Sequence, residues 1–145
     1  MRAVVQRVSQ ASVAVDAHVV AEIGLGVLVL LGVAVGDTTA EPERLAGKIA
    51  RLRIFENDAG RFDHSVLDVG GEALVVSQFT LLADTRKGNR PSFTDAAAPD
   101  VAERVYERFC DALASEGVRV ARGRFGPHMQ VSLVNDGPVT IVLDD

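Results

Sequence analysis

The sequence predicts an α+β fold: a compact single domain over residues 1–145, with a mixed β-sheet or partly closed barrel and two main helices. Three observations lead to this fold class. Short apolar, β-branched segments occupy both ends of the chain. Two well-separated segments with helical periodicity interrupt them. The length of 145 residues suits one domain of ~100–200 residues.

The N-terminal part is predicted to be β-structure. Three strands are expected from its apolar, β-branched segments: Ala3–Val8, Ser12–Val15 and Val19–Ile23. Polar residues predict turns between them, around Ser9–Gln10 and Asp16–Ala17. Val27–Val35 is a continuous apolar run, as expected of a strand that is buried on both faces.

The hydrophobic pattern then changes to a helical period over residues 38–55. Apolar side chains fall at i, i+4 and i+7, on one face of a helix: Leu45, Ile49 and Leu52. Thr38 and Glu41 have the spacing of a capping box, and Pro42 is tolerated in a first turn. A polar loop with a tight turn at Asp58–Gly60 is expected to follow.

The second half of the chain predicts one helix among four strands. A second buried strand is expected at Ala73–Leu82, and a helix from about Pro99 to Ser115. In this helix apolar residues recur every four positions: Val101, Val105, Phe109 and Leu113. Gly117 is a natural stop. Three further strands are predicted: Val118–Ala121, Met129–Asn135 and Val139–Leu143.

Composition excludes several classes of protein. The longest apolar run, Ile23–Val35, has 13 residues, fewer than the ~20 that span a bilayer. Arg2 and Arg7 interrupt any signal peptide, so a cytoplasmic protein is expected. Cys110 is the only cysteine, which excludes an internal disulfide. The motifs of zinc proteases, triad hydrolases and nucleotide-binding loops are absent from the sequence.

Two polar motifs are candidates for a functional site. SQFTL, at residues 77–81, ends a buried strand, where polar groups often mark a cleft, although a strand that emerges into solvent explains the pattern equally. On a strand, Gln78 and Thr80 would point to one face, and Ser77 and Phe79 to the other. NDGPVT, at 135–140, has the composition of a hairpin turn, and its Gly-Pro pair also permits a cis bond.

Basic residues gather in two places in a chain whose net charge is −5. They are Arg86, Lys87 and Arg90 in one loop and Arg119, Arg122 and Arg124 in a later segment. Guanidinium groups match the geometry of phosphates, so contact with a phosphate is one interpretation. A solvated surface is the other. The acidic balance argues against nonspecific binding of nucleic acid through bulk charge.

Taken together, the two polar motifs resemble the paired signature of the D-aminoacyl-tRNA deacylase family. Further blocks similar to that family lie in order along the chain, at residues 6–8, 11–13, 53–55, 90–93, 123–125 and 129–134. The resemblance implies a homodimer that hydrolyses the ester between a D-amino acid, or mischarged glycine, and the 3′-terminal adenosine of tRNA. It also implies proofreading in translation, an active site at the dimer interface, and neither metal nor organic cofactor.

The resemblance also implies roles for single residues. Gln78, Phe79 and Thr80 would lie beside the scissile ester as the catalytic group. The substrate-binding residues would be Ser77, Phe125, Met129, Gly137, Pro138 and Arg7. Among these, Gly137–Pro138 would be a cis dipeptide that reaches into the partner's site, with Arg7 as its brace. Ser77 and Phe79 match the strictly D-specific type, whereas His64 is a departure at the rim.

Two questions stay open on the sequence alone. The attacking group is either Thr80, which has no His or Lys beside it in the motif, or a water that the substrate's 2′-hydroxyl activates. A non-catalytic dimeric module that binds RNA or a metabolite is the alternative function. The preferred D-amino acid and tRNA are not encoded in any recognisable motif.

Overall fold

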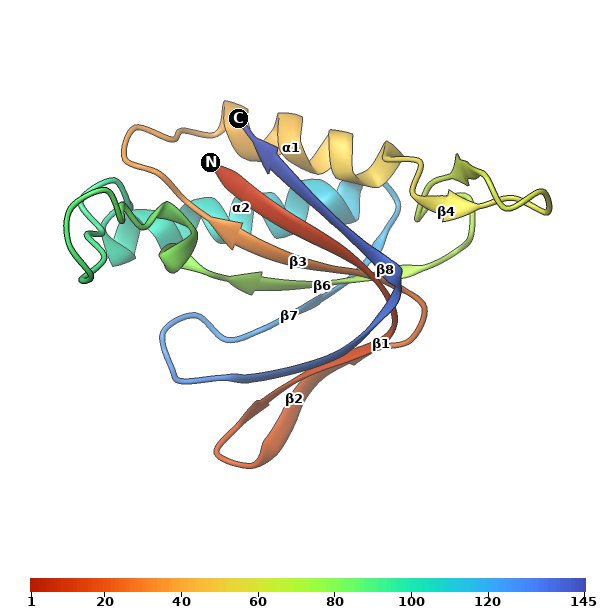
Figure 1. Ribbon diagram of the computed structural model, residues 1–145, viewed down its shortest axis with the longest axis horizontal. Helices are drawn as coiled ribbons and strands as arrows, with labels where there is room; N and C mark the ends of the chain where they lie inside the picture. Colours follow the sequence, from red (N-terminus) through yellow and green to blue (C-terminus); the bar gives the residue numbers. More distant parts are fainter.

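The computed structural model describes residues 1–145 and contains a mixed sheet with two long helices (Figure 1). In chain order the elements are β1 (Arg2–Val15), β2 (His18–Ile23), β3 (Gly26–Gly32), α1 (Ala40–Arg51), β4 (Phe55–Glu56), β5 (Phe62–His64), β6 (Glu72–Ser77), the 3₁₀ helix η1 (Phe79–Leu82), α2 (Pro99–Ser115), β7 (Arg119–Arg122) and β8 (Gln130–Asp144). The predicted fold class, α+β with two main helices, is confirmed. No helix is both long and apolar enough to cross a membrane.

The sheet is built around β1. Its strands lie in the order β2-β1-β3-β6-β7, and β8 pairs with β1 as well. β3, β6 and β7 run parallel, whereas β1 is antiparallel to each of its three partners. The first half of β1 pairs with β3 and the second half with β2, so β1 and β8 bend together and curl the sheet toward a barrel (Figure 1).

The two faces of the sheet bury separate cores. On one face α1 and α2 cover alternate residues of the central strands, among them Val5, Val29 and Val75. The opposite face lies inside the curl of the sheet and buries the residues in between: Val8, Ala11, Val13, Ile23, Leu28, Leu74 and Val76. Because successive strand residues point to opposite faces, the apolar runs of β3 and β6 serve both cores.

The predicted turn at Ser9–Gln10 is wrong, because β1 continues through it as one strand of 14 residues. Val8 pairs with Asn135 and Gln10 with Val134, so Ser9 has no residue opposite it on β8. This extra residue is a β-bulge, which bends a strand without ending it. Exposed polar side chains look the same in a bulge as in a turn.

Two predicted strands extend too far. β3 stops at Gly32 instead of Val35, and Val35 is 67% exposed. β6 stops at Ser77 instead of Leu82, because Gln78 leaves the strand conformation and the chain continues as η1. The expectation that Gln78 and Thr80 alternate with Phe79 along a strand is therefore wrong.

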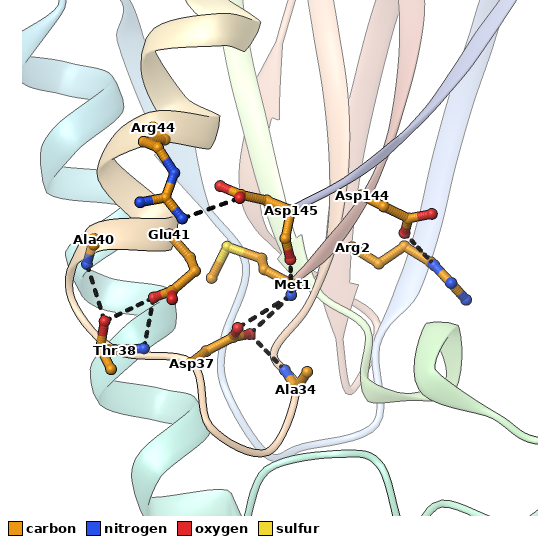
Figure 2. A network of polar contacts seen from close by, with 10 residues as sticks. All are labelled: Met1, Arg2, Ala34, Asp37, Thr38, Ala40, Glu41, Arg44, Asp144 and Asp145. Carbon is orange, nitrogen blue, oxygen red and sulfur yellow. Dashed lines mark hydrogen bonds and ion pairs between the residues drawn. The ribbon is translucent and has the colours of Figure 1, made fainter.

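Both long helices begin close to their predicted starts. α2 spans Pro99–Ser115, with proline at its first position, as predicted. α1 begins at Ala40 after an N-cap, Thr39, that makes no side-chain bond. Glu41 instead accepts hydrogen bonds from the N–H of Thr38 (2.7 Å) and from its hydroxyl (2.8 Å), as Figure 2 shows. These bonds lower the pKa of Glu41 to about 2.

The ends of β1 and β8 are fastened to the loop before α1 (Figure 2). The Met1 ammonium donates to Asp37 (3.2 Å) and to the carbonyl of Asp145 (2.9 Å). The other oxygen of Asp37 accepts from the N–H of Ala34 (2.7 Å). Arg2 pairs with Asp144 at 2.6 Å. The outer strand therefore has ionic as well as ladder contacts along its C-terminal half.

A substitution at Gly26 tests the close approach of β3 and β6. A Cβ at Gly26 would lie 1.8 Å from the Glu72 carbonyl oxygen on the neighbouring strand, whereas a Cβ at Gly24 would meet nothing within 4 Å. We expect Gly26→Ala to lower the free energy of unfolding by roughly 3 kcal/mol. Gly24→Ala, the control, should stay within ~0.5 kcal/mol. Urea denaturation measures both, and equal stability of the two variants would contradict this packing.

Cys110 tests the core beneath α2. Its side chain is buried, and burial raises the pKa of the thiol to about 12. The thiolate is the reactive form. We therefore expect no labelling by a thiol reagent at pH 8 in the native protein and complete labelling in urea. Rapid labelling without denaturant would show that this part of the core opens readily.

Candidate active site

A largely apolar cavity of about 700 Å³ opens beyond the C-terminal end of β6. Three segments line it: the strand end from Val76 to Phe79, the stretch from Phe93 to Ala102 at the start of α2, and the loop from Phe125 to Val131. Val33 completes the lining. Five of the predicted site residues therefore line this one cavity: Ser77, Gln78, Phe79, Phe125 and Met129.

The strand end turns sharply into η1 at the floor of this cavity. The N–H of Gln78 donates to the Leu31 carbonyl at 2.7 Å, which continues the β3–β6 ladder by one bond. The N–H groups of Phe79 and Thr80 come next, in the first turn of η1, where a helix offers no acceptors. Two adjacent backbone donors are therefore left for a ligand.

Thr80 lies beside the cavity rather than on its lining. Its hydroxyl accepts a hydrogen bond from the side-chain amide of Gln78 at 2.5 Å. An amide N–H is a donor and cannot remove a proton from the hydroxyl. The contact fixes the orientation of both side chains but does not activate Thr80 as a nucleophile.

Gly32 allows η1 to lie close to β3. A Cβ at this position would lie 2.4 Å from the Leu82 side chain and 3.1 Å from the Gln78 carbonyl oxygen. A larger residue would have to displace the Leu82 side chain and would crowd the Gln78 carbonyl. Gly32 is therefore a site determinant that the sequence analysis missed, because an apolar run gives no sign of a close approach.

Aromatic side chains form two walls. Phe79 is 54% exposed and packs edge-on against Phe93, with ring centroids 5.0 Å apart. Phe125 also lines the cavity, with its ring 6.2 Å from the ring of Tyr106. In the sequence Phe93 falls only within the block 90–93 that resembles the family, and no motif marks Tyr106.

Tyr106 connects the β6 floor to the loop that follows β7. Its buried hydroxyl donates to the carbonyl of Val75 at 2.8 Å, and the N–H of Gly123 donates to the same oxygen at 3.0 Å. Burial raises the pKa of Tyr106 well above its usual range, so the hydroxyl remains a donor. In the sequence Tyr106 lies on the apolar face of α2. That position predicts a core residue and gives no sign of a hydrogen bond to β6.

The second polar motif lies within β8, so the predicted hairpin turn is wrong. β8 continues from Gln130 to Asp144, with Asn135 paired to Val8 and Thr140 to Gln6. Four residues, 136–139, therefore stand opposite Arg7 alone. This wide bulge contains the cis Gly137–Pro138 bond, and both residues are exposed. Turn-forming residues serve here to bend a strand outward.

Two side chains hold the bulge in shape. The Asn135 amide accepts from the N–H of Val139 (2.8 Å) and donates to the Thr140 hydroxyl (3.0 Å). Arg7, only 6% exposed, donates to the Asp136 carbonyl (2.8 Å) and also to the carbonyl of Ile54 (2.8 Å). The bulge is thus braced from both ends.

One aromatic and two acidic side chains complete the surroundings of Arg7. The ring of Phe62 lies 5.7 Å from its guanidinium carbon, and a Glu56 oxygen lies 3.6 Å from one nitrogen. Asp136 adds a longer contact at 3.9 Å. A buried guanidinium needs such partners, because an unpaired buried charge is strongly unfavourable.

One chain does not bring the two motifs together. Arg7 and Gly137 line a separate cavity of about 450 Å³. Arg7 pairs with Val27, which in turn pairs with Ala73 near the start of β6, four residues before Ser77. That separation is ~13 Å along the strands alone. Figure 1 accordingly has the bend of β8 at the opposite side of the sheet from the C-terminal end of β6.

Comparison with known proteins identifies the family of the chain. The model of the D-Tyr-tRNA(Tyr) deacylase family matches residues 4–144. A D-aminoacyl-tRNA deacylase of Roseiflexus castenholzii is 63% identical over 99% of this chain and 92% of its own length. One from Ruegeria pomeroyi is 60% identical over 99% of each chain.

Two solved structures share the fold of this chain. The structure titled c-Myc DNA Unwinding Element Binding Protein aligns with a TM-score of 0.94 and 44% identity, over 100% of this chain and 99% of that one. A probable eukaryotic D-amino acid tRNA deacylase aligns with a TM-score of 0.85 over 99% of this chain and 98% of its own; at 21% identity it supports the fold alone. The resemblance inferred from the two motifs is confirmed: the chain belongs to the D-Tyr-tRNA(Tyr) deacylase family.

Proposed function

We propose that this protein hydrolyses the ester bond of D-aminoacyl-tRNA and releases the free D-amino acid and the tRNA. Membership of the family supports the reaction. The observation that carries it is the cavity at the end of β6, which aromatic side chains line and beside which two successive backbone N–H groups, those of Phe79 and Thr80, have no helical partners. Such a cavity suits a flat base against the aromatic side chains and a carbonyl group near the backbone donors.

The terminal adenosine is the part of the substrate that fits the apolar walls. Phe79 and Phe93 on one side and Phe125 on the other offer ring faces and edges to a purine. Binding of the base beside the strand end would bring the ribose, and the ester on it, toward Gln78 and Phe79. Every aminoacyl-tRNA has this adenosine, so recognition here does not depend on the amino acid.

The N–H groups of Phe79 and Thr80 are the proposed donors to the developing oxyanion. Each well-aimed donor contributes ~2.7–4 kcal/mol to the transition state of acyl transfer. The Gln78 N–H is excluded from this role, because it is already bonded to Leu31. An aminoacyl ester is intrinsically reactive, so two such donors supply a useful acceleration without a catalytic triad.

Water is the proposed nucleophile, and the vicinal 2′-hydroxyl of the ribose assists it. Thr80 is a poor alternative, since its hydroxyl is held by an amide donor and not by a base. Serine, threonine and cysteine nucleophiles normally depend on an adjacent base or on a lowered pKa. Substrate assistance removes that requirement from the protein.

The exposed bulge of β8 is the proposed chirality filter, acting in the site of a second copy. Gly137 and Pro138 are exposed, and Arg7 holds the bulge from behind. Rigid main-chain carbonyls can accept hydrogen bonds from the substrate ammonium while they leave no room for an L side chain. Because a single chain keeps the two motifs apart, this proposal requires a homodimer. Glycine, which has no side chain, would pass the same filter.

A binding module without catalysis is the alternative function. The printed title of one solved relative names DNA binding. A net charge of −5 does not favour a DNA-binding surface, which depends chiefly on contacts to phosphates. Incubation with D-Tyr-tRNA and L-Tyr-tRNA separates the two functions. We expect hydrolysis of the D ester at least ~100-fold faster; absence of hydrolysis, or equal rates for the two esters, would overturn the proposal.

Substrate assistance makes a paired prediction. We expect Thr80→Ala to keep the single-turnover rate within about fivefold of the native enzyme, since it removes no base. D-Tyr-tRNA with a 2′-deoxy terminal adenosine should react roughly a hundredfold more slowly or worse, because its general base is gone. Thr85→Ala, in an exposed loop, is the matched control. Inactive Thr80→Ala together with normal cleavage of the deoxy substrate would restore Thr80 as the nucleophile.

The filter makes a separate prediction. One glycine inserted between Gly137 and Pro138 displaces the exposed carbonyls, while Asn135 and Thr140 can still pair with β1. We expect deacylation of D-Tyr-tRNA to fall at least ~100-fold, with thermal unfolding shifted by only a few degrees. A glycine inserted between Asp58 and Ala59, at an exposed loop tip, should leave activity unchanged. Full activity of the first variant would remove the bulge from the mechanism.

A further inference from the structure

The basic residues of the chain differ in whether acidic partners already neutralise them. Arg86 makes a two-pronged ion pair with Asp84, at 2.6 and 2.9 Å, and Arg122 pairs with both Glu107 and Asp111. The contacts with Arg86 lower the pKa of Asp84 to about 2, so this pair stays ionised and its charges cancel at neutral pH. Because both arginines are already neutralised by carboxylates, neither is proposed to bind a phosphate.

The unpaired cations differ in how close they lie to the cavity. Lys87, Arg90, Arg119 and Arg124 are exposed and make no ion pair within 4.0 Å. In the ladder between β6 and β7, Arg119 stands opposite Glu72, at the start of β6. This is the end of the sheet away from the cavity. Arg124 directly precedes Phe125, which lines the cavity. Three unpaired cations, Lys87, Arg90 and Arg124, therefore belong to the loops that form the cavity. The other four exposed and unpaired cations do not: Lys48, Arg61, Arg104 and Arg119.

The loop that carries Lys87 and Arg90 is anchored to the cavity wall. Asp84 and Ser92 exchange two backbone hydrogen bonds, at 2.8 and 2.9 Å, which close the loop at its base. Phe93, the next residue, packs against Phe79. The loop that carries the two cations therefore ends beside the cavity wall at Phe93, and Arg124 begins the segment that lines the cavity from Phe125 onward.

We propose that Lys87, Arg90 and Arg124 bind the phosphates that precede the terminal adenosine of the tRNA, an inference that rests on the function proposed above. With the adenosine in the cavity, the chain of nucleotides attached to it must leave between the two loops. Lysine and arginine are the side chains that bind phosphate. Asp95 and Asp100 lie near the same rim, so the local positive excess is small and the contacts should be weak and sensitive to salt.

The test compares two substrates that share the ester but not the phosphates: D-Tyr-tRNA and adenosine esterified with D-tyrosine. We expect Lys87→Ala/Arg90→Ala and Arg124→Ala each to lower kcat/KM for D-Tyr-tRNA roughly three- to fivefold per removed cation at 0.1 M salt. The slope of log kcat/KM against log salt should decrease by ~0.7–0.9 per cation. Hydrolysis of the adenosine ester should not change.

Arg119→Ala is the matched control, since it removes an equally exposed and unpaired cation at the far end of the sheet. It should leave both substrates and the salt slope unchanged. The inference is overturned if the rim variants hydrolyse D-Tyr-tRNA with the native rate and salt slope, if Arg119→Ala has the same effect as they do, or if they lose activity equally on both substrates. Failure of the native enzyme to hydrolyse either ester would overturn the proposed function itself.

Discussion

The close approach of η1 to β3 at Gly32 is the constraint on which the cavity depends. Because Gly32 has no side chain, Leu82 and the Gln78 carbonyl can lie against the strand, and the chain can turn immediately after Ser77. That turn leaves the N–H groups of Phe79 and Thr80 without helical partners beside the cavity, and Phe79 packs against Phe93. The same aromatic contact lies next to the base of the loop that carries Lys87 and Arg90. The backbone donors, an aromatic part of the lining and this loop are therefore all connected to the turn that Gly32 accommodates.

The bulge of β8 rests on a different principle, a buried charge used as a scaffold. Arg7 is nearly inaccessible, and it donates to carbonyls of two separate segments, at Ile54 and Asp136. Such a group is stable only with its partners in place, so it specifies a geometry that an apolar side chain would leave loose. The result is a braced, exposed dipeptide that lies far from the cavity at the end of β6 in its own chain. This separation is the physical argument that the dipeptide acts in the site of a second copy.

The two long helices and the main strands were predictable from sequence, but η1, the short strands β4 and β5, and three of the boundaries that matter most were not. α2 agrees with its prediction because helical periodicity, an initial proline and a terminal glycine all indicate the same limits. β1, β6 and β8 differ from theirs because hydropathy records burial, not backbone continuity. A bulge at Ser9 or at 136–139 exposes polar residues just as a turn does. The site residues came from a resemblance to a family; Gly32 and Tyr106 depend on close contacts between distant segments, which no local pattern contains.

An acidic protein and a polyanionic substrate are compatible because charge acts over a short range. At physiological salt, exposed charges more than ~8 Å apart scarcely affect one another, so the net charge of −5 says little about the field at one rim. Most arginines of this chain already contact a carboxylate: Arg2, Arg7, Arg44, Arg51, Arg53, Arg86, Arg108 and Arg122. Such pairs contribute little to a distant field. What a ligand meets is the unpaired remainder, and its location, rather than the total, decides which face of an acidic molecule accepts a phosphate.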